Sequence, residues 1–282
     1  MCELLAMSSR HSTRLTISLK TLAARGGSAS RNRDGWGVAF YEGNDVALFR
    51  EPTPAGDSRL AQFLEAQGPC TTLAIGHIRH ATRGGIALSN TQPFLRELTG
   101  RMHVFAHNGD LPGIEQHKTL AFDRYRPIGT TDSEHAFCAL LERIRSLWVS
   151  SSSVPPLAAR LAVVTQFAAD LRQLGPANFL YADGDTLFAH GHRRLQPATG
   201  TIEPPGLFVL SRRCRQARDP SGASGISIAD DFQEVVLIAS VPLTDEHWRP
   251  LAEGEILAAS KGQILSAAAS IARARSELIA EG

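Results

Sequence analysis

The chain has 282 residues, of which 43% are hydrophobic and 20% are charged, and its formal net charge is +1. This composition is typical of a soluble globular protein with a substantial core, and the charge near zero argues against nucleic acid or a membrane surface as partner. No apolar run approaches the roughly 20 residues of a transmembrane helix, and no signal-peptide pattern is visible. Four cysteines are widely scattered, which argues against a disulfide framework or a thiolate zinc site and favours the cytoplasm: Cys2, Cys70, Cys138 and Cys214.

The first third of the chain predicts an alternation of short strands and helices. Hydrophobic patterning predicts strands at 3–7, 38–41, 46–49 and 73–78, and helices at 14–24 and 58–66. Gly26-Gly27 ends the first helix, and a polar loop at 28–33 follows it. Gly43-Asn44 joins the second and third strands as a hairpin. A loop that includes 90–94 follows the strand at 73–78.

The middle of the chain predicts one strand and two helices. The strand at 103–106 runs into His107-Asn108-Gly109, a turn signal. A helix opens at 131–134 and keeps its apolar side chains on one face as far as Trp148. Residues 150–156 break this helix, and a second amphipathic helix at 157–171 ends at Gly175-Pro176.

Strands dominate the remainder. Segments 178–182 and 186–189 form a hairpin, further strands are expected at 207–210, 235–239 and 255–259, and 212–225 reads as a loop. The order of strands, two helices and more strands predicts an α+β domain of two packed antiparallel sheets with helices outside. We expect one domain at 2–260 and a helical tail at 261–282 that packs on it.

Cys2 is the first candidate for chemistry. Removal of the initiator Met would leave a thiol and a free α-amino group on one residue. The thiolate is the reactive form of cysteine, and an α-amine with a pKa of about 7.7–8.0 is a base near neutral pH. One residue would then supply both nucleophile and general base.

Three further features lie at predicted strand or helix ends. Each also has a purely structural interpretation: Arg79 is a surface or salt-bridge cation, Asn108-Gly109 is a tight turn, and Asp132 is the N-cap of its helix. Together they suit amide hydrolysis. The Asn108 amide and the Gly109 N–H are donors for an oxyanion, Arg79 suits a substrate carboxylate, and Asp132 suits an ammonium group.

These residues match a known family in order along the chain. Over residues 2–260 the sequence resembles the class II glutamine amidotransferase domain of the N-terminal-nucleophile hydrolases, most closely its stand-alone, YafJ-like members. The resemblance is carried by segments 2–5, 34–37, 76–79, 81–82, 90–94, 107–109 and 131–134.

The resemblance implies a four-layer αββα sandwich. It implies that Cys2 attacks a γ-glutamyl amide, that Asn108 and Gly109 form the oxyanion hole, that Arg79 and Asp132 hold the two charges of the substrate, and that the main chain around Thr82 lines the pocket. Where several relatives have a His after this Thr, the chain has Arg83. A small-molecule substrate, no cofactor and no metal are expected, and the oligomeric state is left open.

Alternatives remain open at this point. The enzyme either hydrolyses glutamine or a γ-glutamyl compound alone, which the absence of a visible second domain favours, or delivers ammonia to a separate synthase. A non-enzymatic regulatory subunit with the same fold is a further alternative. The pairs His77/His80 and His103/His107 have spacings that could ligate zinc, although i,i+3 spacing brings two residues to one face only on a helix and both stretches read as strand.

Overall fold

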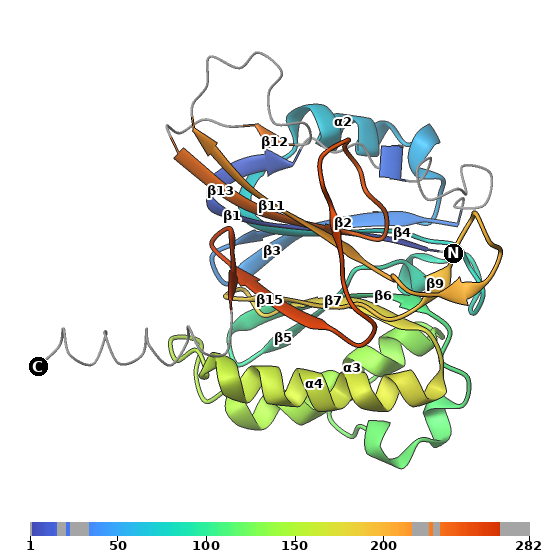
Figure 1. The fold of residues 1–282 in the computed structure, drawn as a ribbon. Coiled ribbons are helices and arrows are strands. Elements are labelled where there is room, and N and C mark those ends of the chain that lie inside the picture. Colours follow the sequence, from blue (N-terminus) through green and yellow to red (C-terminus); the bar gives the residue numbers. More distant parts are fainter. Residues whose placement is uncertain (1, 16–20, 23–33, 216–225, 228–231, 266–282) are drawn as a thin grey trace, which may run out of the picture.

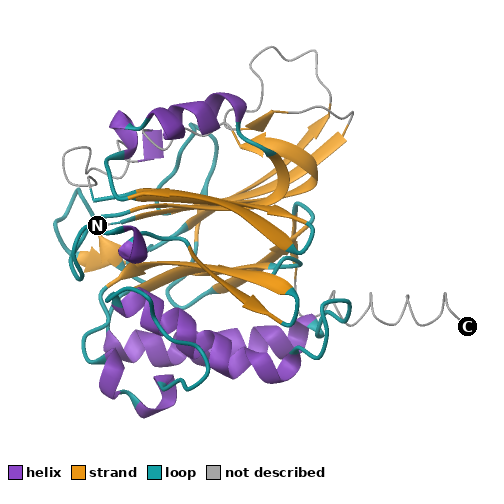
Figure 2. Ribbon diagram, turned by 180° about the vertical axis from the view of Figure 1, so that it is seen from behind, coloured by secondary structure: helices purple, strands orange, loops and turns teal. Residues whose placement is uncertain are grey.

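Two antiparallel sheets lie face to face, with helices on their outer faces, in the computed structural model (Figure 1). The structure describes residues 2–15, 21–22, 34–215, 226–227 and 232–265. Helix α2 (Arg59–Gln67) covers the first sheet, and α3 (Asp132–Ile144) and α4 (Leu157–Leu174) cover the second (Figures 1 and 2). The predicted α+β fold with four αββα layers is therefore confirmed.

The first sheet is built around β1. In spatial order its strands are β14 (Arg249–Pro250), β11 (Phe208–Arg215), β13 (Phe232–Ala239), β1 (Glu3–Leu15), β4 (Cys70–Ile78), β2 (Trp36–Glu42) and β3 (Asp45–Glu51), with β12 (Ile226–Ser227) also paired to β1. The N-terminal strand thus lies in the interior of the sheet, between β13 and β4. This position fixes the residues just before it on a rigid element.

The second sheet contains the strand that ends in Asn108-Gly109. Its order is β16 (Gln263–Leu265), β15 (Ile256–Ser260), β8 (Leu187–His190), β7 (Ala177–Ala182), β6 (Arg101–Gly109) and β5 (Phe94–Leu98). A separate ribbon pairs β9 (Arg194–Leu195) with β10 (Ile202–Glu203). Short 3-10 turns lie at Ala55–Asp57, Leu88–Asn90, Ile114–Gln116, Lys118–Leu120 and Arg145–Leu147.

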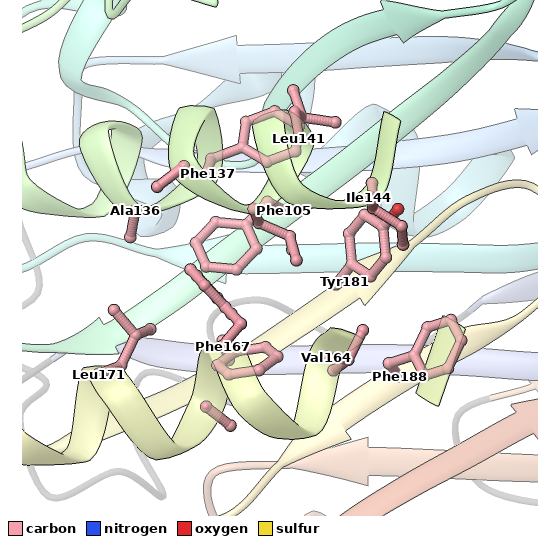
Figure 3. Packing of buried hydrophobic residues seen from close by; sticks show 14 of the residues in the cluster. Phe105, Ala136, Phe137, Leu141, Ile144, Val164, Phe167, Leu171, Tyr181 and Phe188 are labelled. Carbon is pink, nitrogen blue, oxygen red and sulfur yellow. The ribbon is translucent and has the colours of Figure 1, made fainter. Parts of the chain in front are cut away.

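Aromatic packing holds the helices on the second sheet. The Phe105 ring on β6 stacks on Phe137 of α3 with centroids 5.4 Å apart, and Phe167 of α4 meets it edge-on at 6.3 Å (Figure 3). All three rings are fully buried. Because interiors are close-packed, this cluster fixes the start of α3 relative to the end of β6.

Aliphatic side chains fill the space between the two sheets. The buried cluster there combines leucine, isoleucine and valine with alanines from both sheets, among them Ala6 and Ala39 from the first and Ala106 and Ala182 from the second. Burial of this apolar layer holds the two sheets together.

Most predicted elements are present, but three predictions were wrong. Arg14 belongs to β1, paired with Cys70 and Ser227, and so does not open a helix; of the predicted helix, Thr21–Leu22 is helical and the rest lies outside the described residues. His107-Asn108-Gly109 is not a turn, because it continues β6 and pairs with β7. The start of the predicted loop 212–225 continues β11 as far as Arg215.

The helix caps partly match the sequence. Ser58 caps α2 by accepting a hydrogen bond from the Ala61 N–H at 3.0 Å. The cap of α3 is Thr131, whose hydroxyl accepts from the Glu134 N–H at 3.2 Å, so Asp132 is the first helical residue and not the N-cap. The Asp132 side chain is thereby free for other contacts.

The C-terminal boundary of the domain stays a prediction. β16 pairs with β15 and so extends the second sheet to Leu265, while the loops at 28–33 and 216–225 and the tail at 266–282 lie outside the described residues. Of the helices described, none is long and apolar enough to cross a membrane.

Candidate active site

Four chain segments meet at the edge of the sandwich where β1 begins (Figure 1). Cys2 immediately precedes β1, Arg79 immediately follows β4, Asn108-Gly109 ends β6, and Asp132 begins α3. In the β1–β4 ladder Glu3 lies opposite Ile78, so the next residue on each strand places Cys2 beside Arg79. The β1–β4 ladder therefore brings Cys2 beside Arg79, Asn108 contacts Cys2, and Asp132 contacts Leu111 just beyond the end of β6.

Main-chain groups of His80 hold the Cys2 thiol. The His80 N–H donates to Sγ at 3.2 Å, and Sγ lies 3.4 Å from the His80 carbonyl oxygen, to which it can donate. Burial raises the pKa of the Cys2 thiol, while the His80 N–H and the Arg79 charge lower it. A thiol with a raised pKa is protonated at neutral pH and needs a base to react.

Asn108 connects the second sheet to the nucleophile. Its Nδ2 donates to the Cys2 carbonyl oxygen at 2.6 Å. An amide nitrogen has two N–H groups, so one donor remains for a second acceptor. Asn108 is itself held because Asn178, its cross-strand partner, donates from Nδ2 to the Asn108 carbonyl at 3.1 Å.

Gly109 is required by close packing at the end of β6. A Cβ atom at this position would lie 1.8 Å from the Pro176 carbonyl oxygen. Only glycine fits where β6 meets the start of β7. Its main-chain N–H directly follows Asn108 in the chain.

Arg79 organises the loop that follows β4. Its guanidinium donates to the carbonyl oxygens of Arg83 (3.0 Å), Gly84 (3.0 Å) and Gly85 (3.1 Å), and more weakly to that of Asp34 (3.4 Å). The side chain is almost fully buried. Thr82 lies in this loop and is exposed. Arg79 therefore shapes the segment that contains Thr82.

Asp132 faces the segment that follows β6. Its Oδ2 accepts from the Leu111 N–H at 2.8 Å, and its Oδ1 accepts from the Ser133 N–H at 2.8 Å. A carboxylate has about four lone-pair sites, so capacity remains for one more donor such as an ammonium group.

The side chains of Asn90 and Arg83 link the loop after β4 to neighbouring segments. Asn90 donates to the Gly85 carbonyl at 3.0 Å and accepts from the Thr130 N–H at 2.8 Å, which links the loop after β4 to the start of α3. Arg83 Nε lies 3.0 Å from Asp110 Oδ1, which links the same loop to the end of β6.

Asp34 explains the segment 34–37, which the sequence left without a role. Its Oδ2 accepts from the Ala81 N–H at 2.8 Å, and its carbonyl accepts from Arg79. Asp34 and Gly35 precede β2, and Trp36 and Gly37 begin it opposite Ile78 and His77 of β4, so the segment lies beside the end of β4.

His103 and His107 lie on one face of β6 but have different hydrogen-bond partners. His103 Nδ1 is hydrogen-bonded to the Tyr181 hydroxyl at 2.7 Å, and His107 Nδ1 to the Ser133 hydroxyl at 2.9 Å. His77 is fully buried, whereas His80 is partly exposed. In the part of the chain that the structure describes, no group of three or more His, Cys, Asp or Glu side chains could hold a metal ion.

Buried histidines predict marked acid sensitivity. Burial lowers the pKa of His77 and His190 to about 3 and that of His103 and His107 to about 4. In the unfolded chain these four groups bind protons below about pH 6.5, so the unfolded state gains protons and stability falls as the pH drops towards 4.

One group acts in the opposite direction over the same pH range. Burial raises the pKa of Glu3 to about 7, so folding favours its protonated form. The stability that this carboxyl contributes to the folded state increases as the pH falls from 7 towards the pKa that the carboxyl has in the unfolded chain. Four histidines outweigh one carboxyl, so these five groups together make the folded state less stable as the pH falls from 7 to 5. We expect the urea midpoint, followed by circular dichroism, to fall steeply between pH 7 and pH 5. An unchanged midpoint would contradict the neutral state of these histidines.

Comparisons with known proteins point to one family. The family model for class II glutamine amidotransferases matches residues 1–280. The chain is 36% identical to YafJ of Escherichia coli K12 over 256 residues, which cover 90% of this chain and 96% of that protein. A relative in Haemophilus influenzae is 31% identical, with 93% of this chain and 85% of the relative covered.

Solved structures give the same picture. The crystal structure of a predicted glutamine amidotransferase from Pseudomonas aeruginosa PA01 is 31% identical and superimposes with a TM-score of 0.65, covering 94% of this chain and all of that one. The phosphoribosylpyrophosphate amidotransferase of Bacillus subtilis shares the fold at 16% identity and a TM-score of 0.54, with 94% of this chain and 48% of that one covered.

Proposed function

The chain belongs to the class II glutamine amidotransferase family, and from this premise we propose that it hydrolyses the γ-amide of glutamine or of a γ-glutamyl compound through a thioester on Cys2. The observation that carries the proposal is the contact between the two sheets at the site, where Asn108 Nδ2 lies 2.6 Å from the Cys2 carbonyl oxygen. This contact supports Asn108 as an oxyanion donor, because its amide lies beside the residue that we propose as nucleophile.

The reaction begins at the thiol. After removal of Met1, the α-amine of Cys2 accepts the thiol proton, directly or through one water, and Sγ attacks the γ-carbonyl carbon. The Asn108 amide and the Gly109 N–H stabilise the oxyanion of the tetrahedral intermediate. The α-ammonium then returns the proton to the departing nitrogen, and water hydrolyses the thioester to release glutamate.

The two charges of the glutamyl group orient the substrate. Arg79 binds the α-carboxylate, Asp132 binds the α-ammonium group, and the main chain around Thr82 lines the pocket. A carboxylate is a stronger acceptor for a guanidinium than a main-chain carbonyl is. Substrate therefore displaces one or more of the carbonyls of Arg83, Gly84 and Gly85 that now accept from Arg79.

We propose a stand-alone hydrolase acting on a small molecule in the cytoplasm. The described cysteines, Cys2, Cys70 and Cys138, are free thiols, which fits a reducing compartment. The loop after β4 is tied to the chain's own Asp110 through Arg83, and this contact favours a site complete in one chain. Delivery of ammonia to a separate synthase is the second candidate, and it would require glutaminase activity that rises when a partner is added.

Labelling with a glutamine analogue tests the proposal. We expect 6-diazo-5-oxo-norleucine to add once, at Cys2, because among the thiols whose side chains the structure describes only this one belongs to a residue in contact with Asn108, the proposed oxyanion donor. Cys70 is exposed and so serves as an internal control for non-specific alkylation. Intact and peptide mass spectrometry would locate the adduct, and addition at Cys70, Cys138 or Cys214 instead would count against the assignment.

Turnover is tested by a substrate screen. Purified protein should release glutamate from glutamine or from at least one γ-glutamyl peptide or γ-glutamyl amine, measured with glutamate dehydrogenase. No release from any of these by protein that lacks Met1 would favour the regulatory subunit over the enzyme.

A further inference from the structure

A buried carboxyl–guanidinium pair lies one residue from Cys2, and because burial raises the pKa of Glu3 to about 7, its carboxyl is only partly ionised at neutral pH. Arg194 Nη2 donates to Glu3 Oε1 at 2.8 Å, and the side chains are 2% and 0% exposed. The second terminal nitrogen of Arg194, Nη1, donates to the Ser240 carbonyl oxygen at 2.6 Å. Arg194 therefore joins the side chain of Glu3 to the main chain that follows β13.

Ser240 holds the same stretch of β1 from the other side. Its hydroxyl accepts from the Leu4 N–H at 2.9 Å, and its own N–H donates to the Leu4 carbonyl at 3.0 Å. The ribbon that contains Arg194 lies beside the N-terminal end of the chain in both views (Figures 1 and 2). The beginning of β1 is thus fixed at Glu3 and Leu4 by one guanidinium and the serine it contacts.

The pair is poorly explained as a source of stability alone. Removing two charges from water is costly, and the attraction between them repays this only when the remaining polar atoms are also satisfied. Among the described residues, Glu3 Oε2 and Arg194 Nε are buried and have no hydrogen-bond partner. The pair instead fixes the orientation of the groups that it joins, because charge-assisted hydrogen bonds have a defined geometry.

We propose that Arg194 is a positioning residue for the nucleophile: through Glu3 and the Ser240 carbonyl it fixes the start of β1, and thereby the placement of the Cys2 thiol against the substrate carbonyl. The inference rests on the proposed function and deepens it. A displacement of about 1 Å by a residue remote from the chemistry can cost about 10² in rate. Arg79 and Asp132, which hold the substrate, lie on other segments.

The test separates position from stability. Arg194→Met should lower kcat for glutamine about 10²-fold and leave KM within about twofold, because the substrate clamps are unchanged. In the double variant Glu3→Leu/Arg194→Met both charges are replaced by apolar side chains, so its urea midpoint should return towards the wild-type value while kcat stays low. A folded double variant with wild-type kcat would overturn the proposal, and it decides the matter even if Arg194→Met alone fails to fold.

A second buried ion pair provides a matched control. Arg160 and Asp183 are 2.8 Å apart with side chains 4% and 0% exposed, and Arg160 Nε likewise has no partner among the described residues. Asp183 follows the end of β7, five residues beyond Asn178 and roughly 17 Å along the strand direction at ~3.4 Å per residue. Arg160→Met should lower the urea midpoint and leave kcat unchanged.

Alkylation gives a readout that does not need turnover. Iodoacetamide should modify Cys2 several times faster in Arg194→Met than in the wild type, because the partly buried thiol loses its fixed position, while the rate at exposed Cys70 stays the same. Equal Cys2 rates would refute the positioning role. Wild-type protein without Cys2-dependent glutamate release would instead remove the proposed function, and the alkylation rates would still report whether Arg194 holds Cys2.

Discussion

Cys2→Ala is expected to abolish glutamate release, with a loss of about 10⁴-fold or more in kcat. In the proposed mechanism the Cys2 sulfur forms the thioester, and the two other thiols whose side chains the structure describes lie elsewhere: Cys70 is exposed at the start of β4 and Cys138 is buried in α3. Burial raises the pKa of Cys138 to about 12, so that thiol stays protonated. The measurement is glutamate formed per enzyme in single-turnover and steady-state assays.

The Cys2→Ala variant should still fold and still bind glutamine. Cys2 precedes the first strand, so truncation to Ala leaves the Asn108 contact to its main-chain carbonyl in place. We therefore expect an unchanged urea midpoint and binding of glutamine close to that of the wild type. Residual turnover above about 1% would contradict the role of Cys2 as nucleophile.

The base can be removed without touching the thiol. Inserting Lys between Met1 and Cys2 keeps the sulfur but converts the α-amine of Cys2 into a peptide nitrogen, which is not a base. Loss of a general base typically lowers the rate about 10²–10⁴-fold. Intact mass spectrometry should show that wild-type protein lacks Met1. Full activity in the inserted variant would move the base to another group.

The fold was predictable from the sequence where local patterns and tertiary structure agree. Apolar runs predicted β4, β7, β8 and β13, and the helical period of apolar side chains predicted α3, although its N-cap is Thr131 and not the expected Asp132. The prediction failed at Arg14 and at Arg212–Arg215, where polar residues join a strand because β4, β12 or β13 supplies the hydrogen-bond partners. Pairing between distant segments overrides local propensity, and a single sequence does not display it.

The candidate site was likewise predictable from the sequence only in part. Cys2, Arg79, Asn108 and Asp132 were identified because they follow strands or begin a helix and because their chemistry is complementary. The Asn108-Gly109 pair was expected to form a tight turn, but the pairing with β7 makes it the end of a strand, which is what aims Asn108 at Cys2. The Glu3–Arg194 pair spans 191 residues and leaves no local signal in the sequence.

Asn108→Ala is expected to lower kcat by about 10²–10³-fold with little change in KM. In the proposed mechanism the Asn108 amide stabilises charge that develops only in the transition state, so its loss should affect the chemical step more than substrate binding. Asn108→Asp tests the same point at nearly constant volume, since a carboxylate accepts hydrogen bonds and repels an oxyanion. We expect this variant to be slower than Asn108→Ala at pH 7 and to recover partly at lower pH, as far as the acid sensitivity of the fold permits.

The effect on the oxyanion must be separated from the effect on the nucleophile, because the same amide donates to the Cys2 carbonyl at 2.6 Å. If Asn108 only held Cys2 in place, Asn108→Ala would speed alkylation of the thiol as Arg194→Met is expected to do. If it also stabilises the oxyanion, the loss in kcat should exceed that of Arg194→Met at the same alkylation rate. A variant with unchanged kcat and a raised KM would assign Asn108 to ground-state binding and leave the oxyanion to Gly109 alone.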